Sequence, residues 1–295
     1  MDVVERIVAP VAAIMQPPPG MRFDFTHPIG EPALIGADSV SWRIFKNPVT
    51  LFVGGVAAVI LELAEPSVRS GVWDHSSFRT DAVMRLRRTG AAAMMTVYGP
   101  RAEAEKMIGH VVRIHDRVRG TTPDGMAYHA NDPRLLDWVQ ATASYGFIEA
   151  YSRFARPLSE SERASALAEG SISARLYGAV GAPTSRQAWE DLLAGMLPSL
   201  ERSPIVFEFL SIMNEAPLLP KPLRPLQRLM IRAAVDIVPD AVRAKLGLGR
   251  TGLSPFERRL VGLMAGIADR VPIRTAPPAQ ASQRLGRDPA FLYRR

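Results

Sequence analysis

The sequence predicts an all-α protein built as a single bundle of about ten helices. Helix-start signals recur along the whole chain. The longest apolar run, Val49–Leu61, has the length of a buried helix and not of a strand. We find no two alternating apolar runs joined by Asn-Gly or Asp-Gly, so β-hairpins are not expected. Hydrophobic residues make up 47% of the chain, which excludes a mostly disordered protein.

The expected helices follow in order along the chain. The first core helix begins at Asn47-Pro48, an N-cap followed by an N1 proline, and ends at Glu65-Pro66. Similar pairs, or a capping residue with Glu or Gln three positions later, mark the later starts. These are Asp132-Pro133, Ser159 with Glu162, Thr184 with Gln187, Ser203-Pro204, and Ser254-Pro255 with Glu257.

Three regions are expected: an N-terminal arm over residues 1–40, a helical domain over 41–271, and a flexible Arg- and Pro-rich tail over 272–295. The arm contains a PPPG stretch and several turn signals, and the tail has no apolar period. The start of the chain lacks the pattern of a secretion signal, so we expect a cytoplasmic protein. The run Val49–Leu61 is too short to cross a bilayer, so no stable membrane insertion is expected.

The composition narrows the chemistry. Cysteine is absent, which excludes disulfides, thiolate metal sites and a cysteine nucleophile. A metal site would therefore use carboxylates or one of five histidines, which are His27, His75, His110, His115 and His129. The net charge is +7, but much of it lies in the tail. A broad nucleic-acid surface is therefore not expected.

Two helices joined at Gly99-Pro100 carry the functional prediction. Asp81–Tyr98 and Arg101–Arg119 are separated by so short a break that we expect antiparallel neighbours. On the second helix His115 falls on an otherwise apolar stripe. On the first helix three polar side chains share one face; they are Arg85, Arg88 and Thr89.

Arg85 and His115 lie at matching depths in such a pair. Each is about 15 residues from the break, or roughly 22 Å along its helix. Together with small neighbouring side chains, they could form a pocket for an anionic, iron-bearing or polar ligand. A plainer interpretation stays open: His115 is a hydrogen-bonded core residue, the arginines are solvated, and the small residues only permit close packing.

Several blocks in this order resemble the MpaB / rubber-oxygenase catalytic domain family, over roughly Trp42–Leu246. They are the NP-apolar helix, the HSxF turn, RLxRT, VxxIHxxVRG, NDPxLLxWV and the RPLSxxER capping box. The resemblance implies an all-helical protein with non-covalently bound haem b. It also implies oxygenase chemistry on carbon–carbon double bonds of isoprenoid chains, with dioxygen as the partner.

The resemblance also implies roles for individual residues. A histidine that matches His115 is the proximal iron ligand in latex-clearing proteins, and residues that match Arg85 and Thr89 line the haem pocket. We take Arg85, Arg88 and Thr89 as the candidate catalytic residues. His75 is a candidate contact to the haem edge; the alternative is a hydrogen bond that holds its turn.

The chain departs from the family pattern at Arg88, and it lacks two histidines that many relatives have, at Glu65-Pro66 and at Trp138-Val139-Gln140. Latex-clearing proteins have lysine where this chain has Arg88; because arginine does not readily lose its proton, we expect no protein ligand on the distal side of the iron. Those proteins also use a distal carboxylate as a suspected base. Glu62 and Glu65 are the candidates here, with a helix-capping role favoured for Glu65.

The first hypothesis is therefore a haem b-dependent oxygenase that oxidises or cleaves a double bond of an apolar, isoprenoid-like small molecule. A haem-binding sensor, carrier or redox protein without oxygenase activity would use the same site. The third hypothesis is a basic all-α interaction protein without a cofactor, which the confined positive charge disfavours.

Overall fold

The computed structural model describes residues 17–18, 20–249 and 252–294. It confirms the predicted all-α class, because thirteen α-helices account for nearly all regular structure in these ranges. The helices are α2 Val40–Phe45, α3 Pro48–Ala64, α4 Pro66–His75, α5 Ala82–Tyr98, α6 Arg101–His115, α7 Pro133–Phe154, α8 Glu160–Tyr177, α9 Arg186–Met196, α10 Pro204–Glu215, α11 Arg224–Ile237, α12 Asp240–Leu246, α13 Pro255–Ala268 and α14 Pro277–Arg284. Two short 3₁₀ turns, Lys221–Leu223 and Phe291–Arg294, complete them.

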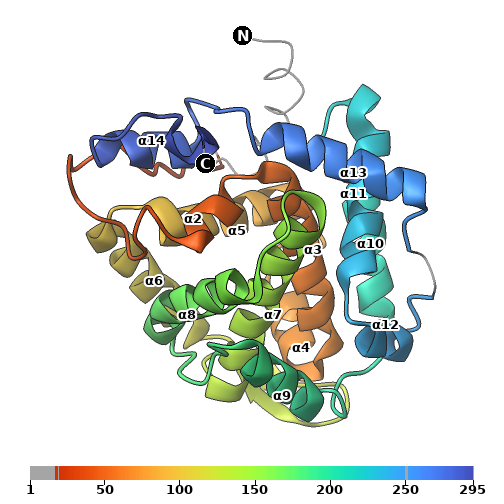
Figure 1. Cartoon of the computed structure of the whole chain (residues 1–295). Helices are drawn as coiled ribbons and strands as arrows, with labels where there is room; N and C mark the ends of the chain where they lie inside the picture. The colour runs from red at the N-terminus through yellow and green to blue at the C-terminus, as the bar shows by residue number, and fades with distance from the viewer. Residues whose placement is uncertain (1–16, 19, 250–251, 295) are drawn as a thin grey trace.

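Helices α3 and α7 form the centre of the molecule (Figure 1). Helix α3 is buried along most of its length, as its apolar sequence predicts. It meets α7 at Gly54 and Gly146, where a Cβ on Gly54 would lie only 2.6 Å from the carbonyl oxygen of Gly146. Glycine at both positions therefore permits the closest contact between the two backbones.

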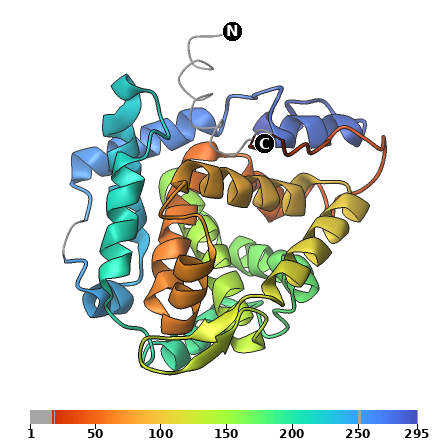
Figure 2. The ribbon, with the colours of Figure 1, turned by 180° about the vertical axis from the view of Figure 1, so that it is seen from behind.

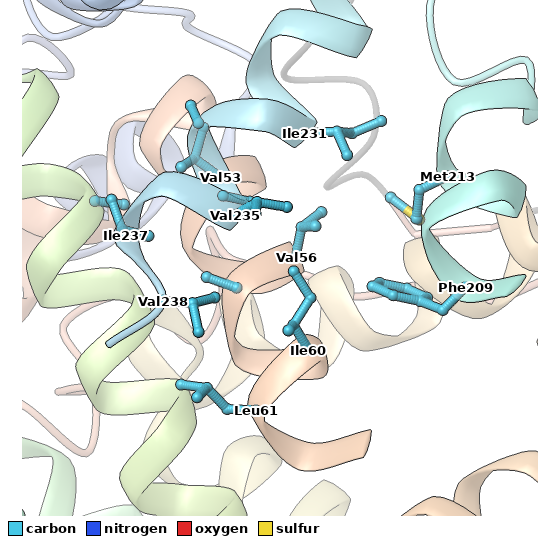
Figure 3. Close-up of a cluster of buried hydrophobic side chains, with 14 of the residues drawn as sticks. Val53, Val56, Ile60, Leu61, Phe209, Met213, Ile231, Val235, Ile237 and Val238 are labelled. Atoms are coloured by element: carbon cyan, nitrogen blue, oxygen red, sulfur yellow. The ribbon is translucent and has the colours of Figure 1, made fainter. Parts of the chain in front are cut away.

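The remaining helices pack on either side of this pair. Helices α10, α11 and α13 lie on one side of α3 and α7, and α2, α5, α6 and α8 lie on the other (Figures 1 and 2). The main hydrophobic core lies between α3 and the first group. Figure 3 shows part of it, with side chains of α3, α10 and α11 packed together: Val53, Val56, Ile60, Phe209, Met213, Ile231 and Val235.

The helix starts agree closely with the capping signals. Asn47, Asp132, Ser159, Ser203 and Ser254 are N-caps as predicted, and each side chain accepts a hydrogen bond from the first turn of its helix. The prediction for α9 is wrong by one position. Its N-cap is Ser185 rather than Thr184.

A short hairpin contradicts the expectation of no β-structure. Strands β1 Arg119–Thr121 and β2 Ala127–His129 pair in antiparallel fashion around Gly125, which adopts a φ of +89°. Helix α6 ends at His115, four residues before the predicted end. Strands of three residues are too short to show a period of two, so the pattern search missed them.

The predicted flexible tail is wrong for most of its length. Residues 277–284 form α14, and the guanidinium of Arg284 is buried. It donates to the carbonyl oxygens of Phe25, Glu31 and Tyr98 at 2.8, 2.9 and 2.8 Å. The tail thus packs against the described part of the N-terminal arm; residues 1–16 and 19 of that arm lie outside the described ranges.

Within the described residues, no single helix is long and apolar enough to cross a membrane. Helices α3 and α4 together reach that length and composition, but they bend by 111° at their junction.

Candidate active site

A cavity of about 350 Å³ lies among α2, α3, α5, α7 and α8. Its walls are mainly apolar, with Phe52, Val59 and Phe147 among them. This size and lining are typical of a site for a small apolar molecule. The side chains that bring polar atoms to its wall are Ser41, Glu62, Arg85, Thr89, Thr96, Gln140, Ser144, Ser173 and Tyr177.

Helix α5 contributes Arg85 and Thr89 to this wall, as the sequence predicts. They stand one helical turn apart. The guanidinium of Arg85 donates a hydrogen bond to Thr89 Oγ1, which in turn donates to the carbonyl oxygen of Arg85 at 3.0 Å. The pair therefore presents a fixed positive charge beside a hydroxyl at one part of the cavity.

Glu62 on α3 lies on the cavity wall near Arg85. Its carboxyl makes no hydrogen bond or ion pair with any residue that the structure describes. Burial raises its pKa to about 7, although the charge of Arg85 partly opposes this shift. Glu62 is therefore a carboxyl group that can hold or release a proton near neutral pH. Glu65, in contrast, caps α4 through Val68 N at 2.8 Å, as predicted.

His115 is the last residue of α6, and its Nδ1 atom is buried with no hydrogen-bond partner among the residues that the structure describes. Burial lowers its pKa, and the positive charge of Arg85 lowers it further. The imidazole is therefore neutral at neutral pH, the form that can bind a metal. It is not part of the cavity wall itself, but it lies within electrostatic range of the Arg85 side chain that is.

The path of α6 differs from the prediction. Figure 2 shows that α5 and α6 diverge from their junction at Gly99-Pro100 instead of running as antiparallel neighbours, and α6 packs on α8 as well as α5. Arg85 and His115 nevertheless lie within electrostatic range of each other.

The match of a family model decides the identity of this fold. Residues 42–269 match the model described as "ER-bound oxygenase mpaB/B'/Rubber oxygenase, catalytic domain". The chain belongs to this MpaB/rubber-oxygenase family. This confirms the resemblance that the sequence blocks indicated.

Two curated relatives share part of the chain. They are the uncharacterized proteins Mb2261 of Mycobacterium bovis and Rv2237 of Mycobacterium tuberculosis. Each is 29% identical over 177 residues, which covers 57% of this chain and 68% of the relative. No solved structure matches the chain significantly.

Two predicted site residues of this MpaB-family chain are not on the cavity wall. Arg88 is exposed and makes no ion pair with a described residue. His75 ends α4, where its Nε2 lies 3.2 Å from the hydroxyl of Tyr128 in β2. The structure therefore gives His75 a partner in the hairpin, whereas Arg88 stays beside Arg85 and Thr89 on α5 but points no atom to the cavity wall.

Two cavity residues, Gln140 and Ser144 on α7, were not predicted as site residues. They lie four positions apart and so share a helix face with Phe147. From the sequence alone, polar residues at this spacing look like a solvated helix surface. Only the packing of α8 and α3 around α7 shows that this face lines a cavity.

Proposed function

We propose that this protein is a haem b-dependent oxygenase that uses dioxygen to oxidise or cleave a carbon–carbon double bond of an apolar, isoprenoid-like substrate. Membership of an oxygenase family supports the reaction class. The observation that carries the proposal is the arrangement of Arg85 and Thr89, which lie on an apolar cavity wall within electrostatic range of an unpartnered imidazole.

The donor chemistry of the residues supports haem as the proposed cofactor. Haem needs only one imidazole from the protein as an iron ligand, and His115 offers a neutral ring with a buried nitrogen that has no partner. No group of three or more His, Asp or Glu side chains in the described ranges could hold a metal ion without a macrocycle. Arg85 would pair with a haem carboxylate or stabilise negative charge that develops in the cavity during the reaction.

When bound, haem would supply the activation of dioxygen. The protein's own residues would control what surrounds it. The apolar walls formed by α3 and α7 exclude water from the substrate. Thr89 holds the Arg85 side chain in place through their hydrogen bond. Glu62 would accept or donate a proton, since its pKa of about 7 makes both forms available at neutral pH.

Haem content of the purified protein tests the proposal. We expect a Soret band and a pyridine haemochrome with one haem b per chain. His115→Ala should abolish or strongly shift the Soret band. His110→Ala, at an exposed position on the same helix, should leave it unchanged. A wild-type protein that takes up no haem, even when titrated with haemin, would refute the assignment.

Turnover separates an oxygenase from a haem-binding sensor or carrier. With an isoprenoid polyene, we expect dioxygen uptake and an aldehyde or ketone product. A haem-loaded protein that consumes no dioxygen with a panel of such polyenes would favour the sensor or carrier.

A further inference from the structure

Gln140 and Ser144 contribute two polar side chains to the α7 wall of the cavity. Neither makes a hydrogen bond to any residue in the described ranges. They stand one turn apart on one helix face, with roughly 6 Å between their Cβ atoms. The residues around them on this face are apolar: Val139, Ala143 and Phe147. Gln140 and Ser144 therefore form one short polar strip on the otherwise apolar α7 wall.

The Ser144 hydroxyl differs in its hydrogen bonding from three other hydroxyl groups of the cavity. Thr89, Thr96 and Ser173 each donate to a backbone carbonyl of their own helix, so their protons are already used. Ser144 makes no such bond, and Gly170 on α8 leaves its hydroxyl uncovered. A Cβ at Gly170 would lie 3.4 Å from Ser144 Oγ.

A pure hydrocarbon would be a poor ligand for such a wall. It would displace water from the Gln140 amide and the Ser144 hydroxyl and leave both groups without partners. Each unpaired group reduces affinity by about tenfold. A ligand oxygen that accepts their hydrogen bonds avoids this loss. Both groups are uncharged, so the oxygen of a neutral hydroxyl or carbonyl group is enough to match them.

We propose that Gln140 and Ser144 bind an oxygen-bearing group of the substrate, so that the cavity selects an apolar chain with a hydroxyl or carbonyl group over a plain hydrocarbon. The inference rests on the proposed function only in taking the cavity as the substrate site. It does not depend on haem or on oxygenase turnover.

Isothermal titration calorimetry of the full-length protein tests this selectivity without turnover. Farnesol, farnesal and the hydrocarbon farnesene, all delivered in one cyclodextrin carrier, share a similar chain. We expect farnesol and farnesal to bind at least about tenfold more tightly than farnesene. The double variant Gln140→Leu/Ser144→Ala should lose this preference by weakening the binding of farnesol, with farnesene bound equally or more tightly.

Two further variants control for indirect effects. Gln187→Leu makes the same replacement on the exposed surface of α9 and should change nothing. Gly170→Ala leaves α7 intact but places a methyl group over the Ser144 hydroxyl, so it should weaken farnesol binding more than farnesene binding. Circular dichroism spectra would show that each variant is folded.

The outcomes separate this inference from the proposed function. Equal affinity of the wild type for farnesol and farnesene, no binding of either, or a preference that survives the double variant would overturn the inference. A colourless protein that still prefers farnesol would refute the haem proposal and leave the role of Gln140 and Ser144 standing.

Discussion

Gly54 of α3 and Gly146 of α7 pack backbone against backbone at the centre of the molecule. The adjacent residues, Gly55 and Phe147, line the cavity. The spacing between two of the cavity walls is therefore set by a contact that admits no side chain.

We expect Gly146→Ala to destabilise the protein by about 1–3 kcal/mol, because its new methyl group would overlap the Gly54 carbonyl. Gly195→Ala is the matched control. Nothing lies within 4 Å of a Cβ at Gly195, so alanine should stabilise α9 by about 0.5–1 kcal/mol. Urea denaturation measures both changes. Equal effects of the two replacements would contradict the close contact.

Glu62 predicts a specific dependence of stability on pH. Its pKa is about 7 in the folded protein against an ordinary value of 4.5. Between these values the unfolded chain has released the proton and the folded chain keeps it, so the Glu62 contribution to stability falls as pH rises. Glu62→Gln removes this contribution. As pH rises across this range, the free energy of unfolding of the variant should increase relative to that of the wild type by at most about 3 kcal/mol.

Denaturation of both proteins at intervals from about pH 5 to pH 8 measures the difference. A difference in stability that stays constant with pH would show that Glu62 is not a buried protonated carboxyl.

The charge of Arg85 influences the pKa values of two neighbouring groups, so its removal should change both. Its positive charge lowers the pKa of both His115 and Glu62. Arg85→Gln should therefore raise the pKa of His115, although burial keeps it below the ordinary value. An NMR titration that follows the imidazole protons measures this shift. Arg88→Gln removes an exposed charge from the same helix and should leave His115 much closer to its wild-type value. Similar shifts from both variants would indicate a general charge effect.

Arg284 predicts that the C-terminal segment stabilises the whole fold. Arg284→Met leaves three buried carbonyl oxygens without their donor and should cost at least about 3 kcal/mol. Arg287→Ala removes a partly exposed ion pair with Asp38 and a cation–π contact with the Phe291 ring, and should cost less, about 1 kcal/mol. Thermal unfolding compares the two. A stable Arg284→Met variant would show that α14 is dispensable.

The helix starts could be predicted because capping depends on neighbouring residues in the chain. Asn47 and Ser159 carry their signals within four residues. The break between α5 and α6 could be predicted for the same reason, because Gly99-Pro100 itself carries the signal. The direction of α6 after that break was not predictable, because it depends on packing against α8.

In the candidate site too, features that depend on local sequence were predictable and features that depend on tertiary packing were not. Arg85 and Thr89 were predicted to lie on one face by helical spacing, and they do share the cavity wall. Arg88 satisfied the same spacing argument but lies outside, since a difference of one position turns a side chain by about 100° around the helix. Gln140 carried no local signal of burial, because only the tertiary packing of α7 encloses it.

The contacts of Lys46 connect the region matched by the family model to the C-terminal segment that follows it. Its buried ammonium group pairs with Asp269 at 3.3 Å and donates to the carbonyl oxygen of Leu292 at 2.9 Å. The segment that defines the family stops at residue 269. A recombinant chain that ends at that boundary would lack Leu292, and the buried Lys46 ammonium would lose one of its two hydrogen-bonding partners. Expression of the domain should therefore include the residues after 269.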